Sequence, residues 1–272
     1  MSAFGRVLVC PDKFRGTLSA AEAAIAIAAG LREAGMRDIA ELPLADGGEG
    51  TLDALLASLG GEAFEASVTG PEGAEIIARW ALLPDGVAVV EMAQASGLAL
   101  VAGRNDPLTA TTRGTGELIA IAAASGATSA IVGVGGSATV DGGLGALEAL
   151  GWRLPLPVVV ACDVATLYPE AAVVFGPQKG AAPAEVDELT HRLERLANEF
   201  LRRTSVDVRT LRGSGAAGGL AGGLAALGAT LCPGFTVVAD AVGFWRYLDG
   251  ATLVITGEGR LPHGSGMSLE AS

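Results

Sequence analysis

A glycine-rich segment that follows an apolar run carries the residue types that bind phosphate. The segment 130–145 reads AIVGVGGSATVDGGLG, so Ser137, Thr139 and Asp141 lie among six glycines. Backbone N–H groups and hydroxyls donate hydrogen bonds to an anion, and a carboxylate can ligate Mg²⁺. A strand predicted over 130–134 would end at these residues, so the segment predicts a phosphate and Mg²⁺ site.

The same segment also fits a dinucleotide-binding pattern. Gly133, Gly135 and Ala138 satisfy G-x-G-x-x-A, and Asp163 ends the next predicted strand, where an acid could bind a ribose. No Gly-Lys-Ser/Thr follows, so the segment is not a Walker A motif. An NAD-binding oxidoreductase therefore stays open as an alternative, as does a tight turn that needs the glycines only for its backbone.

Two carboxylates lie close together in a second glycine cluster. Asp46-Gly47-Gly48-Glu49-Gly50 follows a predicted strand over 39–44 and precedes a predicted helix over 52–59. Asp46 and Glu49 could orient a substrate hydroxyl or hold Mg²⁺ through water. The alternative is an acidic first turn that only stabilises the helix.

Cations are placed in two further loops. Lys13 and Arg15 follow the predicted strand 6–10, and Lys179 lies in the Gly/Pro loop FGPQKG. Such cations could clamp a carboxylate or a phosphate, and a solvated loop is the alternative in both places.

Histidine, zinc and nucleophilic-cysteine chemistry find little support in the chain. His191 lies on the polar face of a predicted helix over 183–203, and His263 lies in a stretch without periodicity. Cys10, Cys162 and Cys232 are far apart and form no CxxC, which favours reduced thiols. Carboxylates, cations and backbone dipoles remain, and phosphoryl transfer needs little else.

Composition excludes several partners. The 272 residues carry a formal net charge of −12, which disfavours nucleic acid and anionic membranes. The uncharged stretches 118–140 and 213–239 are long enough to span a bilayer, but glycines and hydroxyls interrupt both. The first residues do not resemble a signal peptide, so a cytoplasmic protein is expected.

The element pattern predicts an α/β fold. Two successive strand–loop–helix patterns occupy residues 6–59, as in a parallel sheet, and Ser19 and Glu22 predict a capping box at the first helix. Segments 65–69 and 75–83 alternate around a turn, as in a hairpin. This change of pattern near Ala66 predicts that a second domain begins there.

Ten motifs in order resemble the glycerate kinases of the bacterial type-1 family. They are VCPDKFRGTLSA, LPLADGGEGT, VTGPEG, EMAQASGL, TTRGTGELI, VGVGGSATVDGG, ACDV, VFGPQKGA, GSGAAGGLAGGL and VITGEGR. The resemblance implies transfer of the ATP γ-phosphate to D-glycerate with Mg²⁺. It also implies two α/β domains with a cleft between them: residues 1–66 with 250–272, and an inserted domain over 67–249.

The resemblance also implies site residues by motif. The residues expected in catalysis are Asp12, Lys13, Asp46, Glu49, Arg113 and Lys179. The expected phosphate and nucleotide contacts are Gly135, Gly136, Ser137, Thr139 and Gly142. The expected substrate contacts are Gly47, Gly48, Thr112, Gln178, Glu258 and Arg260. Asp141 and Asp163 are the expected metal ligands.

The chain departs from the family pattern in three places. The first motif usually reads PDSFK, whereas here Lys13 replaces the serine and Arg15 the lysine. A longer family segment is reduced to LPLP before Val158. After Arg260 the family continues with a Lys-containing motif and further elements, whereas this chain reads LPHGSGMSLEAS. We therefore expect the first domain to be incomplete at its C-terminus, and an inactive nucleotide-binding remnant is a third possibility.

Overall fold

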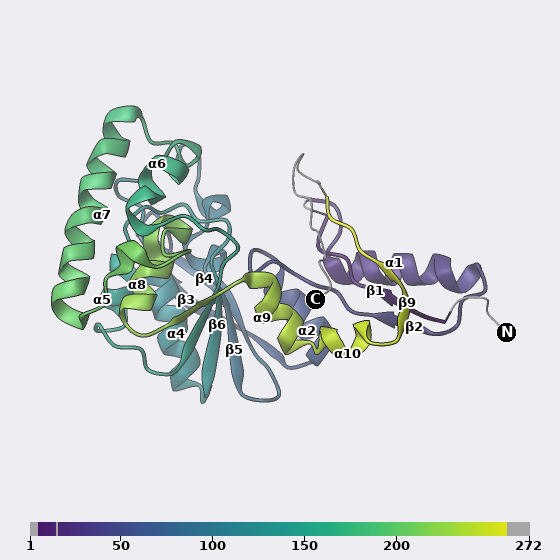
Figure 1. The fold of residues 1–272 in the computed structure, drawn as a ribbon. Helices are drawn as coiled ribbons and strands as arrows, with labels where there is room; N and C mark the ends of the chain where they lie inside the picture. Colours follow the sequence, from purple (N-terminus) through teal and green to yellow (C-terminus); the bar gives the residue numbers. More distant parts are fainter. Residues whose placement is uncertain (1–4, 15, 260–272) are drawn as a thin grey trace.

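Two separate β-sheets organise the chain in the computed structural model, which describes residues 5–14 and 16–259 (Figure 1). A three-stranded sheet has the order β2-β1-β9, and a six-stranded sheet has the order β3-β4-β5-β6-β7-β8. The strands are β1 (Arg6–Val9), β2 (Ile39–Glu41), β3 (Glu62–Thr69), β4 (Glu75–Leu82), β5 (Val87–Glu91), β6 (Ser129–Gly133), β7 (Val158–Ala161), β8 (Thr230–Cys232) and β9 (Ala251–Ile255). The predicted α/β class is confirmed.

Helices surround both sheets (Figure 1). They are α1 (Ala20–Glu33), α2 (Thr51–Leu59), α3 (Ala93–Ser96), α4 (Arg113–Ala124), α5 (Leu144–Ala149), α6 (Ala171–Phe175), α7 (Pro183–Thr204), α8 (Leu220–Ala226), α9 (Gly234–Ala241) and α10 (Phe244–Leu248). Short 3-10 helices are η1 (Leu98–Leu100), η2 (Tyr168–Glu170), η3 (Pro177–Lys179), η4 (Val208–Thr210) and η5 (Ala216–Gly219).

The small sheet is parallel throughout, because β1 pairs in parallel with both β2 and β9. Helix α1 covers one face, where Val7 and Val9 pack with Ala24. The predicted capping box at its start is confirmed: the Ser19 hydroxyl accepts a hydrogen bond from the Glu22 N–H, and the Glu22 carboxylate accepts one from the Ser19 N–H.

The large sheet joins a hairpin to a parallel half. β3 and β4 pair antiparallel over their whole length, as predicted, whereas β5 to β8 run parallel. Parallel strands need covering on both faces. A core that joins the two sheets meets this need on one face, since Leu8 of β1, Leu52 of α2, Ile131 of β6 and Val238 of α9 belong to one buried cluster.

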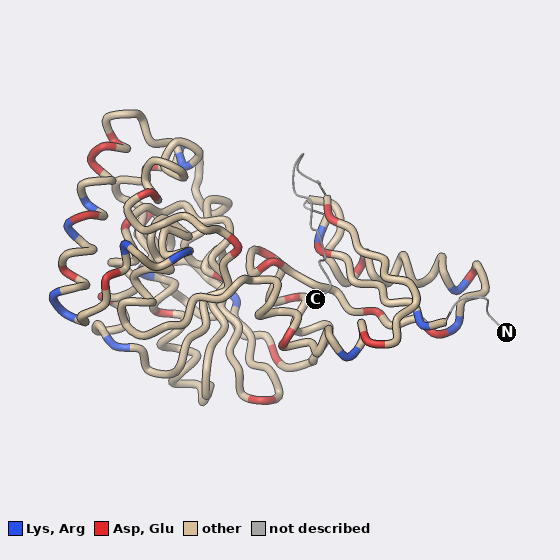
Figure 2. Tube along the Cα trace, viewed as in Figure 1, with Lys and Arg blue, Asp and Glu red and all other residues tan. Residues whose placement is uncertain are grey.

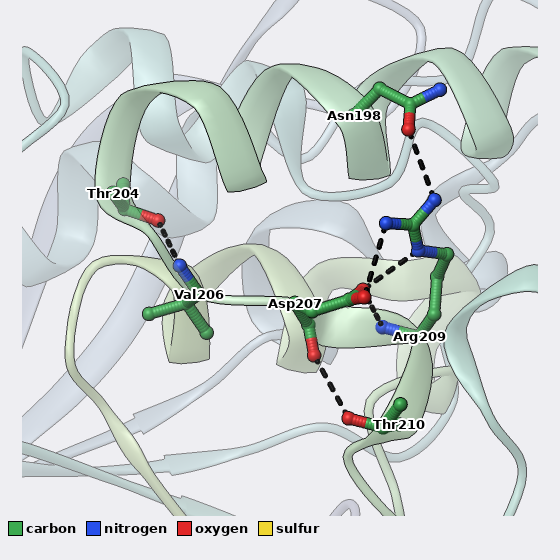
Figure 3. Close-up of polar contacts among 6 residues, drawn as sticks. All are labelled: Asn198, Thr204, Val206, Asp207, Arg209 and Thr210. Carbon is green, nitrogen blue, oxygen red and sulfur yellow. Dashed lines mark hydrogen bonds and ion pairs between the residues drawn. The ribbon is translucent and has the colours of Figure 1, made fainter.

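Helix α7 forms an outer wall of the large sheet's lobe (Figure 1). Leu189, Leu193 and Phe200 recur at helical spacing, form an apolar stripe and are fully buried, and acidic and basic residues alternate along the rest (Figure 2). The helix ends at Thr204, and the capping residue Ser205 has a left-handed φ of 63°. Beyond it, Arg209 pairs with the Asp207 carboxylate and donates to the Asn198 side chain at 3.0 Å, which anchors η4 to the helix (Figure 3).

The two uncharged stretches fold into short elements. Residues 118–140 contain most of α4 and all of β6, and residues 213–239 contain η5, α8, β8 and part of α9. Within 5–14 and 16–259, no helix combines the length and the apolar character that crossing a membrane requires.

The chain passes between the sheets twice, once between β2 and β3 and once between β8 and β9. All eight residues of β3 pair with β4 in the large sheet, so the predicted boundary at 66/67 falls inside a strand. The residue limits of the two domains stay a prediction, and residues 260–272 of the first lie outside the described part of the chain.

Candidate functional site

A cavity of about 380 Å³ lies where loops that follow strands of both sheets meet. Parallel strands gather the residues after their carboxyl ends at one edge, which is where α/β proteins bind ligands. The predicted site residues that line the cavity are Asp46, Gly47, Gly48, Gly135, Gly136, Ser137, Asp163, Gln178 and Lys179. Leu98, Val164 and Phe175 add apolar wall.

The two glycine clusters form the cavity wall by packing backbone against backbone. A Cβ at position 135 would lie 2.7 Å from the Cα of Gly48, and one at position 133 would overlap the carbonyl of Gly47. Side chains are therefore sterically excluded here. The loop after β2 and the loop after β6 approach one another because both are glycine at the contact.

Lys179 is a buried cation in this wall. Its side chain is 3% exposed, and its ammonium donates to the Ser137 hydroxyl at 2.6 Å and to the Thr139 carbonyl at 2.7 Å. Burial lowers the pKa of Lys179 to about 7, against the opposing influence of Asp141. An ammonium has three N–H donors, so one remains for a ligand.

Lysine is scarce in this chain. Of its 18 basic Lys and Arg residues, Lys13 and Lys179 are the two lysines, and the remainder are arginines. Lys179 lines the cavity, and the Lys13 ammonium lies 3.6 Å from the carboxylate of Asp46 at the cavity's edge. Both lysine side chains of the chain thus lie beside this site, whereas its other Lys and Arg positions carry guanidinium groups.

Carboxylates converge on the same edge from three strands. Asp12 follows β1, Asp46 follows β2 and Asp163 follows β7. Burial is the main cause that raises the pKa of Asp12, and the charges of Asp46 and Glu258 add to it. Desolvation likewise raises the pKa of Asp163, with Asp46 and Asp12 contributing. This concentration of negative charge attracts a cation.

A nucleotide-borne Mg²⁺ is compatible with these residues. Within residues 5–14 and 16–259, no three His, Cys, Asp or Glu side chains are placed to hold a metal ion by themselves. Mg²⁺ that arrives on phosphates needs only one or two carboxylates and keeps several waters. Asp163 suits this need, since one of its oxygens accepts the Gly234 N–H at 2.8 Å and the side chain lines the cavity.

Asp141 and its neighbours do not line the cavity. The Asp141 carboxylate accepts hydrogen bonds from the N–H and hydroxyl of Thr112, at 2.8 and 2.7 Å, and from the N–H groups of Gly143 and Gly145. All four groups that donate to the Asp141 carboxylate belong to the protein. The carboxylate therefore holds the starts of α4 and α5 together. Arg113 is exposed and pairs with Glu117 along α4.

The remaining predicted residues lie at varied distances from the cavity. Thr139 is buried and contacts Lys179 through its carbonyl, and Gly142 is buried where its carbonyl accepts the Tyr168 hydroxyl at 2.9 Å. Glu258 is exposed and near enough to Asp12 to affect its pKa. Arg260 lies outside the described residues.

Glu49 lines a second cavity, of about 340 Å³, on the other side of the Asp46–Gly50 loop. Lys13 and the acidic residues Asp53 and Glu91 also line it. Glu91 is buried, and that burial raises its pKa. Three carboxylates to one lysine make this cavity the poorer place for a phosphate.

Sequence reasoning missed several residues that line the main cavity or lie beside it. Ala216 and Ala217 line it, and Ala217 has a left-handed backbone with φ 53° and ψ 41°. Asn105 is buried beside Lys179. Ala216 and Ala217 belong to the motif GSGAAGGLAGGL, which could have pointed to them, but Asn105 belongs to no chemical motif.

Comparison with known proteins identifies the family of the chain. A sequence model of the glycerate kinase family matches residues 7–157 and 155–267. The chain belongs to the glycerate kinase family. The predicted resemblance is thereby confirmed, and the dinucleotide-binding alternative is not favoured.

Relatives in this family match nearly the whole chain. The glycerate 2-kinase of Escherichia coli K12 is 41% identical over 94% of this chain and 77% of its own length. The glycerate kinase of Bacillus subtilis 168 is 40% identical over the same shares. A crystal structure from Salmonella typhimurium LT2 that is assigned as glycerate kinase 2 has a TM-score of 0.89 and 38% identity, covering 97% of this chain and 81% of that one.

Proposed function

We propose that this chain transfers the γ-phosphate of ATP to D-glycerate, giving a phosphoglycerate and ADP. Membership of the glycerate kinase family supports the reaction. The observation that carries the site is the buried Lys179 ammonium, which faces a cavity built from the glycine loops of both sheets. Phosphoryl transfer relies mainly on positioning and charge neutralisation, and this cavity supplies both.

The nucleotide phosphates are proposed to lie against the loop after β6. Gly135 and Gly136 leave room for phosphate oxygens, and Ser137 and Lys179 offer donors from the cavity wall. The third N–H of Lys179 would neutralise charge that builds on the phosphoryl group as the bond to ADP breaks. The apolar wall near Val164 and Phe175 is left for the nucleoside.

Glycerate is proposed to lie beside Asp46 and Lys13. The Lys13 ammonium offers a positive charge for the glycerate carboxylate, and Asp46 offers an oxygen for the reacting hydroxyl. In the reaction, the hydroxyl oxygen bonds to the γ-phosphorus, its proton passes to Asp46, and the bond to the β-phosphate oxygen breaks.

Mg²⁺ would enter as part of the nucleotide substrate, held by Asp163 with Asp46 nearby. Bound there, it neutralises phosphate charge. The Escherichia coli relative is named as a glycerate 2-kinase, so we propose the 2-hydroxyl as the acceptor. A cytoplasmic location, where ATP is supplied, completes the proposal.

A coupled assay tests this function. Purified protein with Mg·ATP and D-glycerate should release ADP, and enolase should accept the product only if the 2-hydroxyl is phosphorylated. K179M should lower kcat/KM about 100-fold or more, because it removes a buried charge aimed at the phosphates. R246M, which changes an exposed cation of α10, should keep wild-type activity. ADP release that is independent of glycerate would contradict the acceptor assignment.

A further inference from the structure

Asn105 joins the two segments that hold Lys179. Its side-chain N–H₂ group donates one hydrogen bond to the Ala138 carbonyl and one to the Lys179 carbonyl, both at 2.8 Å. Two carbonyl acceptors fix which end of the amide faces them, because the amide oxygen cannot donate. Asn105 lies before α4, far in sequence from both partners, and is 7% exposed.

The side chain of Lys179 also joins these two segments by its own hydrogen bonds. The Lys179 carbonyl accepts from Asn105, which also donates to Ala138 of the loop after β6, and the Lys179 ammonium donates to Ser137 and Thr139 of that same loop. Asn105 donates to the carbonyl of Ala138, the residue between Ser137 and Thr139 in the sequence. Four hydrogen bonds therefore fix both ends of one flexible side chain against one loop.

We propose that Asn105 is a positioning residue for Lys179, holding the η3 turn against the loop after β6 so that the third ammonium N–H points into the cavity. This inference rests on the proposed function only for its kinetic consequence. A buried polar group is costly unless it is satisfied, and the Asn105 side-chain oxygen has no hydrogen-bond partner among the described residues. The two hydrogen bonds that the Asn105 N–H₂ group donates, rather than any contact of its oxygen, therefore account for the buried position of this side chain.

The neighbouring Arg104 provides a matched control. Its guanidinium donates to the Gly180 carbonyl at 3.1 Å, so it anchors the same turn one residue further on, but from an exposed position. If any anchor of the turn were sufficient, removing Arg104 would have the same effect as removing Asn105. If the placement of the ammonium is what matters, only Asn105 should affect it.

The two lysines of the chain permit a measurement that needs no turnover. Protein labelled with [ε-¹³C]lysine should give two lysine resonances, and K13R assigns the one that remains to Lys179. In wild type the Lys179 resonance should titrate near pH 7. In N105A the released turn lets the ammonium reach water, so the titration midpoint should rise by at least one pH unit toward the ordinary 10.5.

N105D gives the same test with nearly unchanged side-chain volume, since its carboxylate cannot donate to the two carbonyls. It should raise the midpoint further, because it adds negative charge near the ammonium. Both variants should lower kcat about 10- to 100-fold, whereas R104A should leave the midpoint and kcat unchanged. Circular dichroism shows whether each variant is folded, and if N105A is not, N105D decides.

An unchanged Lys179 midpoint in a folded Asn105 variant would overturn the positioning role, whatever the activity. An equal shift in R104A would also overturn it, in favour of a general anchoring of the turn. Wild-type protein without glycerate-dependent ADP release would refute the proposed function instead, and the NMR titration would still be readable.

Discussion

At the scale of single residues, the site buries the ammonium group of Lys179, and removing this charge from water costs free energy. Lys179 is 3% exposed, and the hydroxyl and carbonyl that it contacts are neutral acceptors. Burying an ammonium without a carboxylate in contact is unfavourable, which is why its pKa is lowered to about 7. Functional sites commonly retain such unfavourable groups at the expense of stability.

The stability of K179M should therefore depend on pH in a predictable direction. Between pH 7 and 10.5 the unfolded wild type keeps the lysine proton that the folded form has lost, so wild-type stability rises with pH there. Below pH 7 both forms are charged and the full cost of burial applies. The stability of K179M relative to wild type should be greatest near pH 6 and fall by up to about 1.4 kcal/mol per pH unit above 7. Urea denaturation at several pH values measures this, and a difference independent of pH would contradict the burial of the charge.

Asp163 should have opposite effects on nucleotide binding with and without Mg²⁺. D163N can still accept the Gly234 N–H but loses a negative charge beside the cavity. Without Mg²⁺, ATP should bind D163N several-fold more tightly because repulsion is reduced, and with Mg²⁺ it should bind several-fold more weakly. Calorimetry with and without Mg²⁺ measures both, with D187N of exposed α7 as the control. Weaker binding in both conditions would indicate that Asp163 acts only through α9.

At the scale of elements, the loops after β2 and β6 depend on each other for their shape. G135A would place a methyl group 2.7 Å from the Cα of Gly48, so one loop must move. We expect a loss of about 1–3 kcal/mol in stability and a raised KM for ATP. G30A is the matched control: position 30 lies within α1 with nothing within 4 Å, so alanine should stabilise the protein by up to about 1 kcal/mol. Thermal melts and steady-state kinetics separate the two outcomes, and a G135A variant with unchanged melting and KM would contradict this close packing.

Elements with a strong local pattern could be predicted from the sequence, whereas others could not. The capping box of α1, the β3–β4 hairpin and the apolar stripe of α7 each have a period or cap that the chain displays directly. Residues 229–250 gave no such signal, and they form β8, α9 and α10, of which β8 has three residues. Short elements like these are fixed by tertiary packing rather than by local propensity.

The sequence could predict those residues of the candidate site that directly follow a parallel strand. Asp46 and Ser137 line one cavity because parallel strands end at the same edge. Spacing does not tell which way a side chain points, so the contacts of Asp141 with Thr112 and with the amides of its own turn were not foreseeable. Asn105 could not be identified because its partners are distant in sequence.

At the scale of the whole molecule, both passages of the chain between the sheets meet at the site. The first contains Asp46, and the second begins at Gly234, where a Cβ would overlap the carbonyl of Asp46. Gly234 also donates to Asp163, so the second passage contacts a cavity residue of the large sheet as well. The placement of the two lobes and the placement of the carboxylates are therefore set by the same contacts.

The pairing of β1 with β9 has a consequence for synthesis of the protein on the ribosome. The large sheet draws its strands from residues 62–232, whereas contacts of β1 with β9 join residues 246 positions apart. At the usual 5–20 residues per second, β1 must wait on the order of 10 to 50 s for this partner. Val7, Leu8 and Val9, fully buried in the folded protein, are without that neighbour during the interval. The wall that carries Asp12 is thus completed after the wall that carries Ser137, so the first strand to leave the ribosome is the last to gain its full set of neighbours.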